Sequence, residues 1–450
     1  MTPPSKRVPA RPRSELPGLA ARRTAAALLR RIFEGGVPLD ALTDEDHGYA
    51  HFRQLESRDR ALVRAILGAA LRRRGEIAAA IARSLNKPLP DRAGSLDAIL
   101  HVGAAQILFL DVPDHAAVSL AVTHAAEDRT TRNARGLVNS VLRRIARERS
   151  EILARPDAIR LDAPEWLFER WTAAYGEETA EAIASAHLYQ PGLDITPKHN
   201  PALWADRLGG TLLPTGTIRL GAAGRVSVLP GYTEGAWWVQ DAAAALPARL
   251  LRAAPGQRVA DLCAAPGGKT AQLAAAGAAV TAVDLQPSRL KRLAGNLRRL
   301  GLSAELVAAD VLKWEPPELF DAVLVDAPCS ATGTIRRHPD VQWLKRPQDI
   351  GSLAELQAAM LDRAAAWVKP GGRLVFCTCS LEPEEGDAQT GPFLAAHSDF
   401  ALEPIDPAEI GGLASLLTPS GTLRTLPGSS IEGTAETGMD GFHAARFRRS

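Results

Sequence analysis

The sequence predicts a multidomain protein in which an all-α helical domain precedes an α/β domain of the Rossmann-like, doubly wound class. Through residues 19–149, apolar residues recur at three- and four-residue intervals, and the alternation typical of strands is absent. Between residues 258 and 377, short apolar segments alternate instead with segments of helical length, the pattern of a parallel sheet covered on both faces. A glycine-rich turn follows the first of these strands, as a nucleotide-like cofactor requires.

Composition sets the broad class. The chain has 450 residues, of which 46% are hydrophobic and 23% charged, ordinary values for a protein of two or three soluble domains. Its four cysteines are too few and too clustered for a secreted disulfide framework. The sequence has no signal-peptide pattern and no apolar stretch that could span a bilayer. We therefore expect a cytoplasmic protein without a membrane partner.

The N-terminal third is predicted to be helical and basic. Residues 1–17 form a proline-rich basic tail that we expect to be disordered. The helical domain covers residues 18–150, with helices expected at 20–29, 59–68, 96–110, 116–126 and 137–147. Residues 1–150 carry 25 Lys/Arg and 16 Asp/Glu, a balance of +9, whereas the rest of the chain has a balance of −7. Such a balance suits either a bound polyanion or a solvated helical surface, and charge alone leaves both open.

A connector is predicted at residues 151–235, and the α/β domain at 236–450. The connector has one expected helix over 164–186 and short strands at 193–196 and 217–220, and we assign no chemistry to it. The α/β domain begins near Trp237. Its strands are expected at 258–263, 279–284, 304–308, 321–326 and 373–377, with helices at 287–300 and 350–367.

The glycine-rich turn lies in Asp261–Thr270. A P-loop would need glycine where Cys263 stands, and Gly-x-Gly-x-x-Gly is also absent. Gly267 and Gly268 still allow backbone amides to approach a polar ligand at a helix N-terminus. Strand-end carboxylates then follow at Asp284, Asp310 and Asp326. Such carboxylates often cap helices, but three of them after a glycine turn indicate a cofactor with a sugar diol and an amine, such as S-adenosylmethionine.

Two thiols follow neighbouring predicted strands. Cys329 lies in Asp326-Ala-Pro-Cys329-Ser, and Cys379 lies in Thr378-Cys-Ser380. A thiolate can add to C6 of a pyrimidine, which makes C5 able to accept a methyl group. Asp326 is suited to donate a hydrogen bond to N3 when its carboxyl is protonated. Cys263 and Cys377 lie within strand sequence and fit buried hydrophobic positions better. The residues alone do not rank Cys379 above Cys329.

These motifs carry a resemblance to known families. Residues 236–448 resemble RNA cytosine-5 methyltransferases of the Sun/Fmu type through the segments 261–270, 326–334, 336–343, 378–380 and 438–442. Residues 18–150 resemble the NusB-like RNA-binding helical domain through 99–118 and 137–143. The combination of both domains resembles those members of the Sun/Fmu family that methylate small-subunit ribosomal RNA.

The resemblance implies a role for each site residue. Cys379 attacks C6, Cys329 assists release of the methylated product, and Asp326 completes the catalytic set, with no metal ion. The implied S-adenosylmethionine contacts are Cys263, Ala264, Ala265, Pro266, Gly267, Gly268, Lys269, Asp284, Asp310 and Asp326. The chain departs from its relatives in two places: Lys198 stands where many have arginine, and His443 where many have a second aromatic residue.

The mechanism also limits the substrate. Stacking hides C6, so the target cytosine must be unpaired or extruded. We therefore expect unassembled small-subunit ribosomal RNA as the partner, bound by a monomer. DNA cytosine-5 methyltransferases use the Pro-Cys thiol as the nucleophile, but a second thiol and a NusB-like domain favour RNA. A transfer-RNA cytosine-5 methyltransferase and a non-catalytic RNA-binding ribosome assembly factor are the alternatives.

Overall fold

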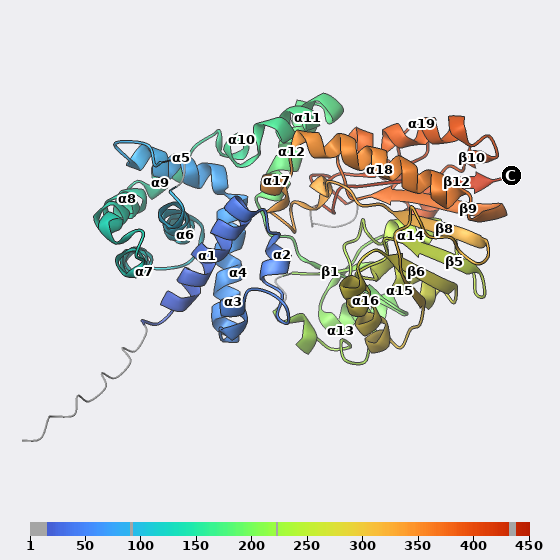
Figure 1. Ribbon diagram of the computed structural model, residues 1–450, viewed down its shortest axis with the longest axis horizontal. Coiled ribbons are helices and arrows are strands. Elements are labelled where there is room, and N and C mark those ends of the chain that lie inside the picture. The colour runs from blue at the N-terminus through green and yellow to red at the C-terminus, as the bar shows by residue number, and fades with distance from the viewer. Residues whose placement is uncertain (1–15, 91–92, 222–223, 432–437) are drawn as a thin grey trace, which may run out of the picture. The chain divides into compact units, whose positions relative to one another are not determined.

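The computed structural model describes residues 16–90, 93–221, 224–431 and 438–450. Most of the predicted basic tail, residues 1–15, therefore lies outside the described residues. The chain divides into two compact units, of which one ends at Asp162 and the other runs from Ala163 to Ser450 (Figure 1). The division falls twelve residues after the predicted end of the helical domain at residue 150, and the predicted connector is not a unit of its own.

The N-terminal unit contains only helices among its described residues. The five predicted helices are present as α1, α4, α6, α7 and α8, while α2, α3, α5, α9 and α10 were not predicted. Their bounds are α1 Leu19–Gly35, α2 Leu39–Leu42, α3 Ala50–Gln54, α4 Ser57–Arg72, α5 Arg74–Ser84, α6 Ser95–Phe109, α7 Asp114–Glu127, α8 Arg135–Arg147, α9 Arg149–Leu153 and α10 Ala158–Asp162.

Helix α6 lies at the centre of this unit. All residues from Ala98 to Leu108 are buried, so the helix is enclosed on every side. A methyl group added at Gly103 would come within 2.5 Å of Leu142 Cδ1, which shows that α6 and α8 pack at close range. A larger residue at this position would require the buried Leu142 side chain to move.

The C-terminal unit begins with two helices and a small sheet. The single helix predicted over 164–186 is wrong: α11 (Glu165–Tyr175) and α12 (Glu177–His187) are separated at Gly176, whose φ of 84° breaks the helix. An antiparallel sheet follows with strand order β2-β3-β1-β4. Its elements are β1 Leu193–Pro197, α13 Pro201–Leu208, β2 Thr211–Leu212, β3 Ile218–Leu220 and β4 Trp237–Val239. The segment near Trp237 thus pairs with the small sheet and not with the large one.

The large sheet has the order β10-β12-β9-β8-β5-β6-β7, with β11 paired to β12. The pairs among β9, β8, β5, β6 and β7 are all parallel, as predicted. These strands are β5 Arg258–Leu262, β6 Ala279–Asp284, β7 Glu305–Ala308, β8 Phe320–Asp326 and β9 Val368–Thr378. The helices of this region are α14 Leu246–Leu250, α15 Gly268–Ala275, α16 Pro287–Leu300, α17 Val341–Leu344, α18 Pro347–Ala365 and α19 Asp387–Ala396.

One edge of the large sheet is antiparallel and was not predicted. Strand β12 (Phe442–Arg449) runs antiparallel to β9, and β10 (Phe400–Leu402) and β11 (Leu423–Thr425) run antiparallel to β12. The β12 sequence carries His443, Arg446 and Arg448, and these charged or polar residues hide the apolar pattern of a strand. Cys379 follows β9 directly, so β12 lies beside the strand that leads to this thiol.

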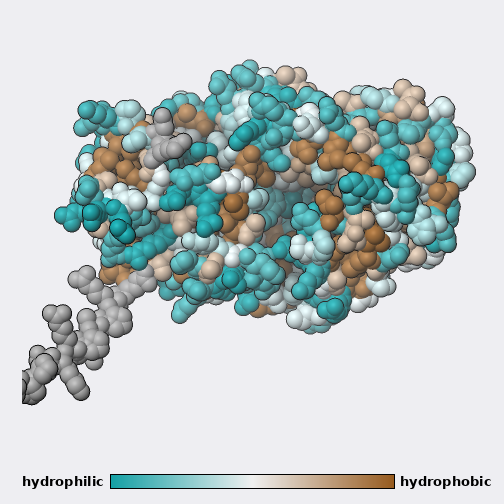
Figure 2. Space-filling view, in the orientation of Figure 1, coloured by the Kyte–Doolittle hydropathy of each residue, from teal (hydrophilic) through white to brown (hydrophobic). Residues whose placement is uncertain are grey.

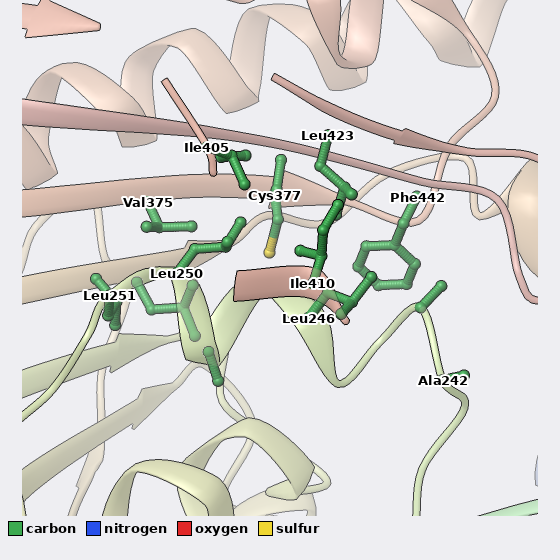
Figure 3. Close-up of a cluster of buried hydrophobic side chains, with 14 of the residues drawn as sticks. Ala242, Leu246, Leu250, Leu251, Val375, Cys377, Ile405, Ile410, Leu423 and Phe442 are labelled. Atoms are coloured by element: carbon green, nitrogen blue, oxygen red, sulfur yellow. The ribbon is translucent and has the colours of Figure 1, made fainter. Parts of the chain in front are cut away.

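A buried hydrophobic cluster fills one face of the large sheet. Figure 3 shows Cys377 within this cluster, between side chains of α14, of β9 and of the strands and turns that follow it. Cys377 is fully buried, as the sequence predicts for a cysteine within a strand. A second cluster, which includes Phe320, Phe376 and Phe447, covers the other face. The sheet is therefore enclosed on both faces.

The surface shows no continuous hydrophobic band on the visible face. Hydrophilic residues predominate there, and hydrophobic residues form small separate groups (Figure 2). Within the four described ranges, none of the helices combines the length and the apolar character needed to cross a bilayer.

Candidate active site

The glycine-rich turn connects β5 to α15. Gly267 has a φ of 102°, and a Cβ there would approach Leu293 Cγ to 2.7 Å, so only glycine fits. Thr270 Oγ1 donates a 2.5 Å hydrogen bond to Asp261 Oδ2 and ties the helix to the strand. Burial raises the pKa of the Asp261 carboxyl to about 7. The buried Asp261 carboxyl group thus fixes the turn through Thr270, and the backbone of the turn lies at the carboxyl end of the sheet.

Asp284 ends β6, and Asp310 lies two residues after the end of the neighbouring strand β7. Asp284 is fully buried, and its carboxylate accepts hydrogen bonds from the backbone N–H of Ala265 (3.1 Å) and of Gln286 (3.0 Å). Asp310 is half-buried and accepts from the Leu312 N–H at 3.0 Å. The structure therefore brings Asp284 against the glycine turn and leaves Asp310 one strand away, because β7 is the outermost strand.

Asp326 ends β8 and is paired with a lysine of the glycine turn. Lys269 Nζ lies 2.8 Å from Asp326 Oδ2, and Cys377 Sγ lies 3.4 Å from Oδ1. Lys269 is almost fully buried, and its ammonium also lies 5.0 Å from the centre of the Phe442 ring. Despite this burial, the nearby Asp326 carboxylate keeps the pKa of Lys269 above its usual value. The ion pair links the predicted cofactor turn to the predicted catalytic carboxylate.

The two strand-end thiols meet. Cys329 Sγ and Cys379 Sγ are 3.4 Å apart, and both residues are half-buried. Their strands β8 and β9 are parallel neighbours, so their carboxyl ends lie at the same edge. Hydrogen bonding with Cys379, then burial, raise the pKa of the Cys329 thiol well above its usual range. Cys329 therefore remains a thiol near neutral pH and can exchange a hydrogen bond with its partner.

The other two cysteines differ from this pair. Burial and the nearby carboxylates raise the pKa of Cys263 to about 12. Burial, followed by the charge of Asp326, raises the pKa of Cys377 well above its usual range. Neither thiol ionises near neutral pH. Cys377 is buried within β9, as predicted, whereas Cys263 follows the end of β5 at Leu262 with a φ of 60° and is only partly buried, so its predicted place within the strand is wrong.

An ion-pair network that was not predicted supports the segment after Cys329. Arg336 donates to Asp440 Oδ1 at 2.8 Å and also binds Asp241, while Arg337 Nε donates to Asp440 Oδ2 at 2.7 Å. Asp241 in turn accepts from the Asp440 backbone N–H at 3.0 Å. Arg336 and Asp440 both lie in segments that the sequence resemblance singled out, but their contact spans 104 residues and has no local signal.

Helix α11 holds the segment that follows Cys379. Arg170 binds the carboxylates of Glu382 and Glu384, the latter at 2.6 Å, and the Tyr175 hydroxyl donates to the Leu381 carbonyl. The connector, to which the sequence assigned no chemistry, therefore contacts the chain next to the predicted nucleophile. Lys198 donates to the Leu300 carbonyl at 2.6 Å and so joins the segment after β1 to the end of α16.

Comparisons with known proteins identify the class. The family described as 16S rRNA methyltransferase RsmB/F matches residues 248–448, and the NusB family matches residues 19–147. Together with the strand-end carboxylates and the glycine turn, these matches define an S-adenosylmethionine-dependent RNA methyltransferase with an N-terminal NusB domain.

Relatives that match over the whole chain establish the family. A protein of Shewanella oneidensis named Ribosomal RNA small subunit methyltransferase B is 33% identical over 443 residues, which cover 95% of this chain and 99% of the relative. A Klebsiella pneumoniae protein of the same name is 36% identical over 397 residues, which cover 85% and 91%. The chain therefore belongs to the 16S rRNA methyltransferase RsmB/F family, as the sequence resemblance predicted.

A solved structure confirms the fold. The crystal structure of PH0851 matches with a TM-score of 0.73 over 97% of this chain and 100% of that chain, at 24% identity. At this identity the likeness concerns the fold alone.

The residues present fit S-adenosylmethionine. At the carboxyl end of the sheet, a turn that tolerates no Cβ at Gly267 lies beside the carboxylates that end β6 and β8. These groups match the polar features of the cofactor: backbone amides for its carboxylate, and carboxylates for its ribose hydroxyls and its amine.

Proposed function

We propose that this enzyme methylates C5 of a cytosine in small-subunit ribosomal RNA through a covalent bond between Cys379 and C6. The observation that carries this proposal is the pair of thiols 3.4 Å apart at the ends of neighbouring parallel strands. A methyltransferase that acts on a heteroatom needs no thiol at this place, whereas addition to a pyrimidine ring needs a nucleophile. The names of the relatives, which specify the small ribosomal subunit, support the choice of RNA.

Each catalytic residue has a proposed role. The Cys379 thiolate forms a bond to C6, and the ring electrons displaced toward C5 make that carbon nucleophilic. Asp326, held by Lys269 Nζ at 2.8 Å, hydrogen-bonds to the N3 edge of the base and donates when its carboxyl is protonated. After C5 has gained a methyl group, a base accepts the C5 proton, the electrons of that bond restore the C5–C6 double bond, and the C6–S bond breaks to release the Cys379 thiolate. Cys329, in contact with Cys379, assists this release.

The cofactor supplies the methyl group from its sulfonium centre. We propose that Cys263, Ala264, Ala265, Pro266, Gly267, Gly268, Lys269, Asp284, Asp310 and Asp326 hold it. Among these residues, Asp284 is suited to the ribose diol, because it lies directly beside the turn and bonds to the Ala265 N–H. Asp310, half-buried at the next strand, is suited to an exocyclic amine.

The test is transfer of labelled methyl groups to protein-free small-subunit RNA. We expect product from the wild type, none from Cys379→Ala, and a trapped protein–RNA adduct from Cys329→Ala. Cys377→Ser serves as a matched thiol control and should retain transfer, because Cys377 is enclosed in the core cluster (Figure 3) and serine keeps a donor for Asp326 Oδ1. Transfer by Cys379→Ala at the wild-type rate would refute the covalent mechanism. Transfer to transfer RNA alone would change the substrate and keep the chemistry.

The state of the RNA is a separate part of the proposal. A cytosine whose C6 must be reached from outside the stack is more available before the subunit is assembled. We expect faster methylation of free small-subunit RNA than of intact subunits, measured with both substrates at equal concentration. The reverse order would refute this part.

The cytoplasmic location and the monomeric state remain predictions, and light scattering of the purified chain tests the monomeric state.

A further inference from the structure

A fully buried glutamate bonds to the neighbours of both thiols. Glu385 has no exposed surface, and its side chain accepts hydrogen bonds from four donors. Oε1 accepts from the Ser330 backbone N–H at 2.8 Å and from Gln357 Nε2 at 3.1 Å. Oε2 accepts from the hydroxyls of Ser330 and Ser380, the latter at 2.5 Å. A buried carboxyl group with this many donors is well satisfied and fixed in place.

The positions of these donors in the sequence are informative. Ser330 follows Cys329, and Ser380 follows Cys379. Thr378, which precedes Cys379, donates to the main-chain carbonyl of Glu385 at 2.8 Å. Cys379 therefore lies between two residues that both bond to Glu385, and the peptide that joins Cys329 to Ser330 bonds to the same side chain. Thr332 Oγ1 also lies 3.4 Å from the hydroxyls of Ser330 and of Ser380, so Glu385 provides the shorter contacts between the neighbours of the two thiols.

We propose that Glu385 is a positioning residue that sets the separation of Cys329 and Cys379. The proposal rests on the two-thiol mechanism proposed above. The strands β8 and β9 are joined by their ladder only as far as Asp326 and Cys377, so the thiols lie beyond it. Beyond the ladder, Glu385 joins the two segments by side-chain hydrogen bonds, with Ser330 Oγ and Ser380 Oγ 3.0 Å apart.

The consequence is catalytic, because both thiols must reach one base. A misplacement of about 1 Å can cost about 100-fold in rate. We therefore expect Glu385→Gln to lower kcat about 10–100-fold, with the KM values for RNA and for S-adenosylmethionine within about twofold of the wild type. Glu385→Asp keeps the carboxylate but withdraws it by one methylene, and it should lower kcat as well. Glu355→Gln, at an exposed position of α18, is the matched control and should leave kcat unchanged.

A second measurement reports the thiols without catalysis. Phenylarsine oxide bridges two adjacent thiols: two As–S bonds form, and the oxygen leaves with both thiol protons as water. The second bond is intramolecular, so the affinity depends on the separation of the sulfur atoms. The wild type should bind one equivalent, Cys379→Ala should lose this site, and Glu385→Gln should bind at least about tenfold more weakly.

A double-mutant cycle shows whether Glu385 acts through the two serines. If it does, Glu385→Gln should cost little further kcat in a chain that already carries Ser330→Ala and Ser380→Ala. Additive losses, or wild-type kcat and arsenical binding in Glu385→Gln, would overturn the proposal. So would parallel losses of kcat, cofactor affinity and melting temperature with unchanged arsenical binding, the pattern of a residue that only stabilises the fold.

The two proposals fail in different ways. If wild-type protein methylated no RNA, or if Cys379→Ala remained active, the proposed function would fail. Arsenical binding by the wild type and by Glu385→Gln would still report the positions of the thiols, because it needs no methyl transfer. If the wild type is active through Cys379 and Glu385→Gln behaves as the wild type, only the positioning role fails.

Discussion

His443 is fully buried on β12, although imidazole is a polar group. Neither ring nitrogen has a hydrogen bond in the part of the chain that the structure describes, and Asp387 Oδ1 lies 3.4 Å from Nε2. Burial, then the charge of Arg424, lowers the pKa of His443 to about 3. The unfolded chain takes up this proton near pH 6.5. His443 therefore opposes folding increasingly as the pH falls from about 6.5 toward 3.

We predict that His443→Phe removes part of the acid sensitivity of the protein. Between pH 7.5 and pH 5, the unfolding free energy should fall about 2 kcal/mol less in the variant than in the wild type. Urea unfolding at the two pH values measures this difference. His397→Phe, at a half-buried histidine that bonds to Asp362, is the control. Equal pH dependence in wild type and His443→Phe would contradict the interpretation.

The sequence was sufficient for residues whose role shows locally. Cys329 and Cys379 lie beside turn-forming residues at the ends of neighbouring predicted strands, so the approach of the two thiols could be predicted. Glu385 could not be selected in the same way. It stands in Glu382-Pro-Glu384-Glu385, where nothing marks one carboxylate as buried. Its contacts with Ser330 join positions 55 residues apart, and such contacts follow only from the packing of β8 against β9.

At the scale of elements, Arg170 of α11 binds two carboxylates, those of Glu382 and Glu384, whose surroundings differ. The Glu382 side chain is fully buried, whereas the Glu384 side chain is 47% exposed. A buried carboxylate that loses its partner keeps the full cost of its desolvation, while an exposed one regains water. The two members of this pair are therefore expected to contribute unequally to stability.

We predict that Arg170→Gln destabilises the protein by about 1–3 kcal/mol and increases amide hydrogen exchange in residues 380–387. Glu384→Gln, which removes the exposed partner of the same arginine, should cost less than about 1 kcal/mol. Hydrogen exchange and urea unfolding test both variants. A larger effect from Glu384→Gln than from Arg170→Gln would show that the exposed pair holds this segment.

The buried carboxyl group of Asp162 joins α10 to the backbone of α5 in the N-terminal unit. The Glu76 N–H donates to Asp162 Oδ1 at 2.9 Å, and both side chains are almost fully buried. Burial raises the pKa of Asp162 to about 7. The folded state therefore keeps a proton that the unfolded chain loses near pH 4, and stability decreases as the pH rises from about 4 to about 7.

We predict that amide protection in α5, corrected for intrinsic exchange, decreases between pH 5 and pH 8 in the wild type and changes little in Asp162→Asn. The asparagine keeps an acceptor for the Glu76 N–H and removes the charge. Asp157→Asn, at an exposed site, is the control and should behave as the wild type. An unchanged pH dependence in Asp162→Asn would contradict this assignment.

Some elements could be predicted and others could not, for physical reasons. The strands β5, β6 and β8 are mostly buried and mostly apolar, so their bounds were nearly correct. The helix predicted over 164–186 is interrupted at Gly176, where glycine adopts a positive φ at little cost. The break could not be predicted, because the apolar pattern continues on both sides of this glycine. Strand β12 was missed because its C-terminal half carries three arginines, of which Arg449 pairs with Asp399.

At the scale of the whole molecule, we expect the helical unit to contribute RNA binding and the methyltransferase unit to contribute the methyl transfer. The site residues all lie after Ala163, while the excess of basic residues lies in the first third of the chain. Arginine contacts with phosphates release counterions, so they make RNA affinity depend on salt. Recognition of the RNA backbone and the chemistry on the base are thus expected to be separable.

We predict that a chain starting at Ala163 binds S-adenosylmethionine as the full chain does, but has a KM for RNA at least about tenfold higher and a weaker salt dependence. Methyl transfer at several salt concentrations, together with calorimetric cofactor binding, measures these quantities. The same salt dependence in both chains would place the RNA contacts in the second unit.

The position of β12 has a consequence for biosynthesis. Strand β9, which leads to Cys379, gains its second neighbour only from residues 442–449 at the far end of the sequence. Domains generally form from the N-terminus as the chain emerges from the ribosome, so the helical unit can be ready to hold RNA while the sheet is still incomplete. A nascent or prematurely terminated chain could then occupy RNA without modifying it. The pairing of β12 with β9 would then be the step that completes the site.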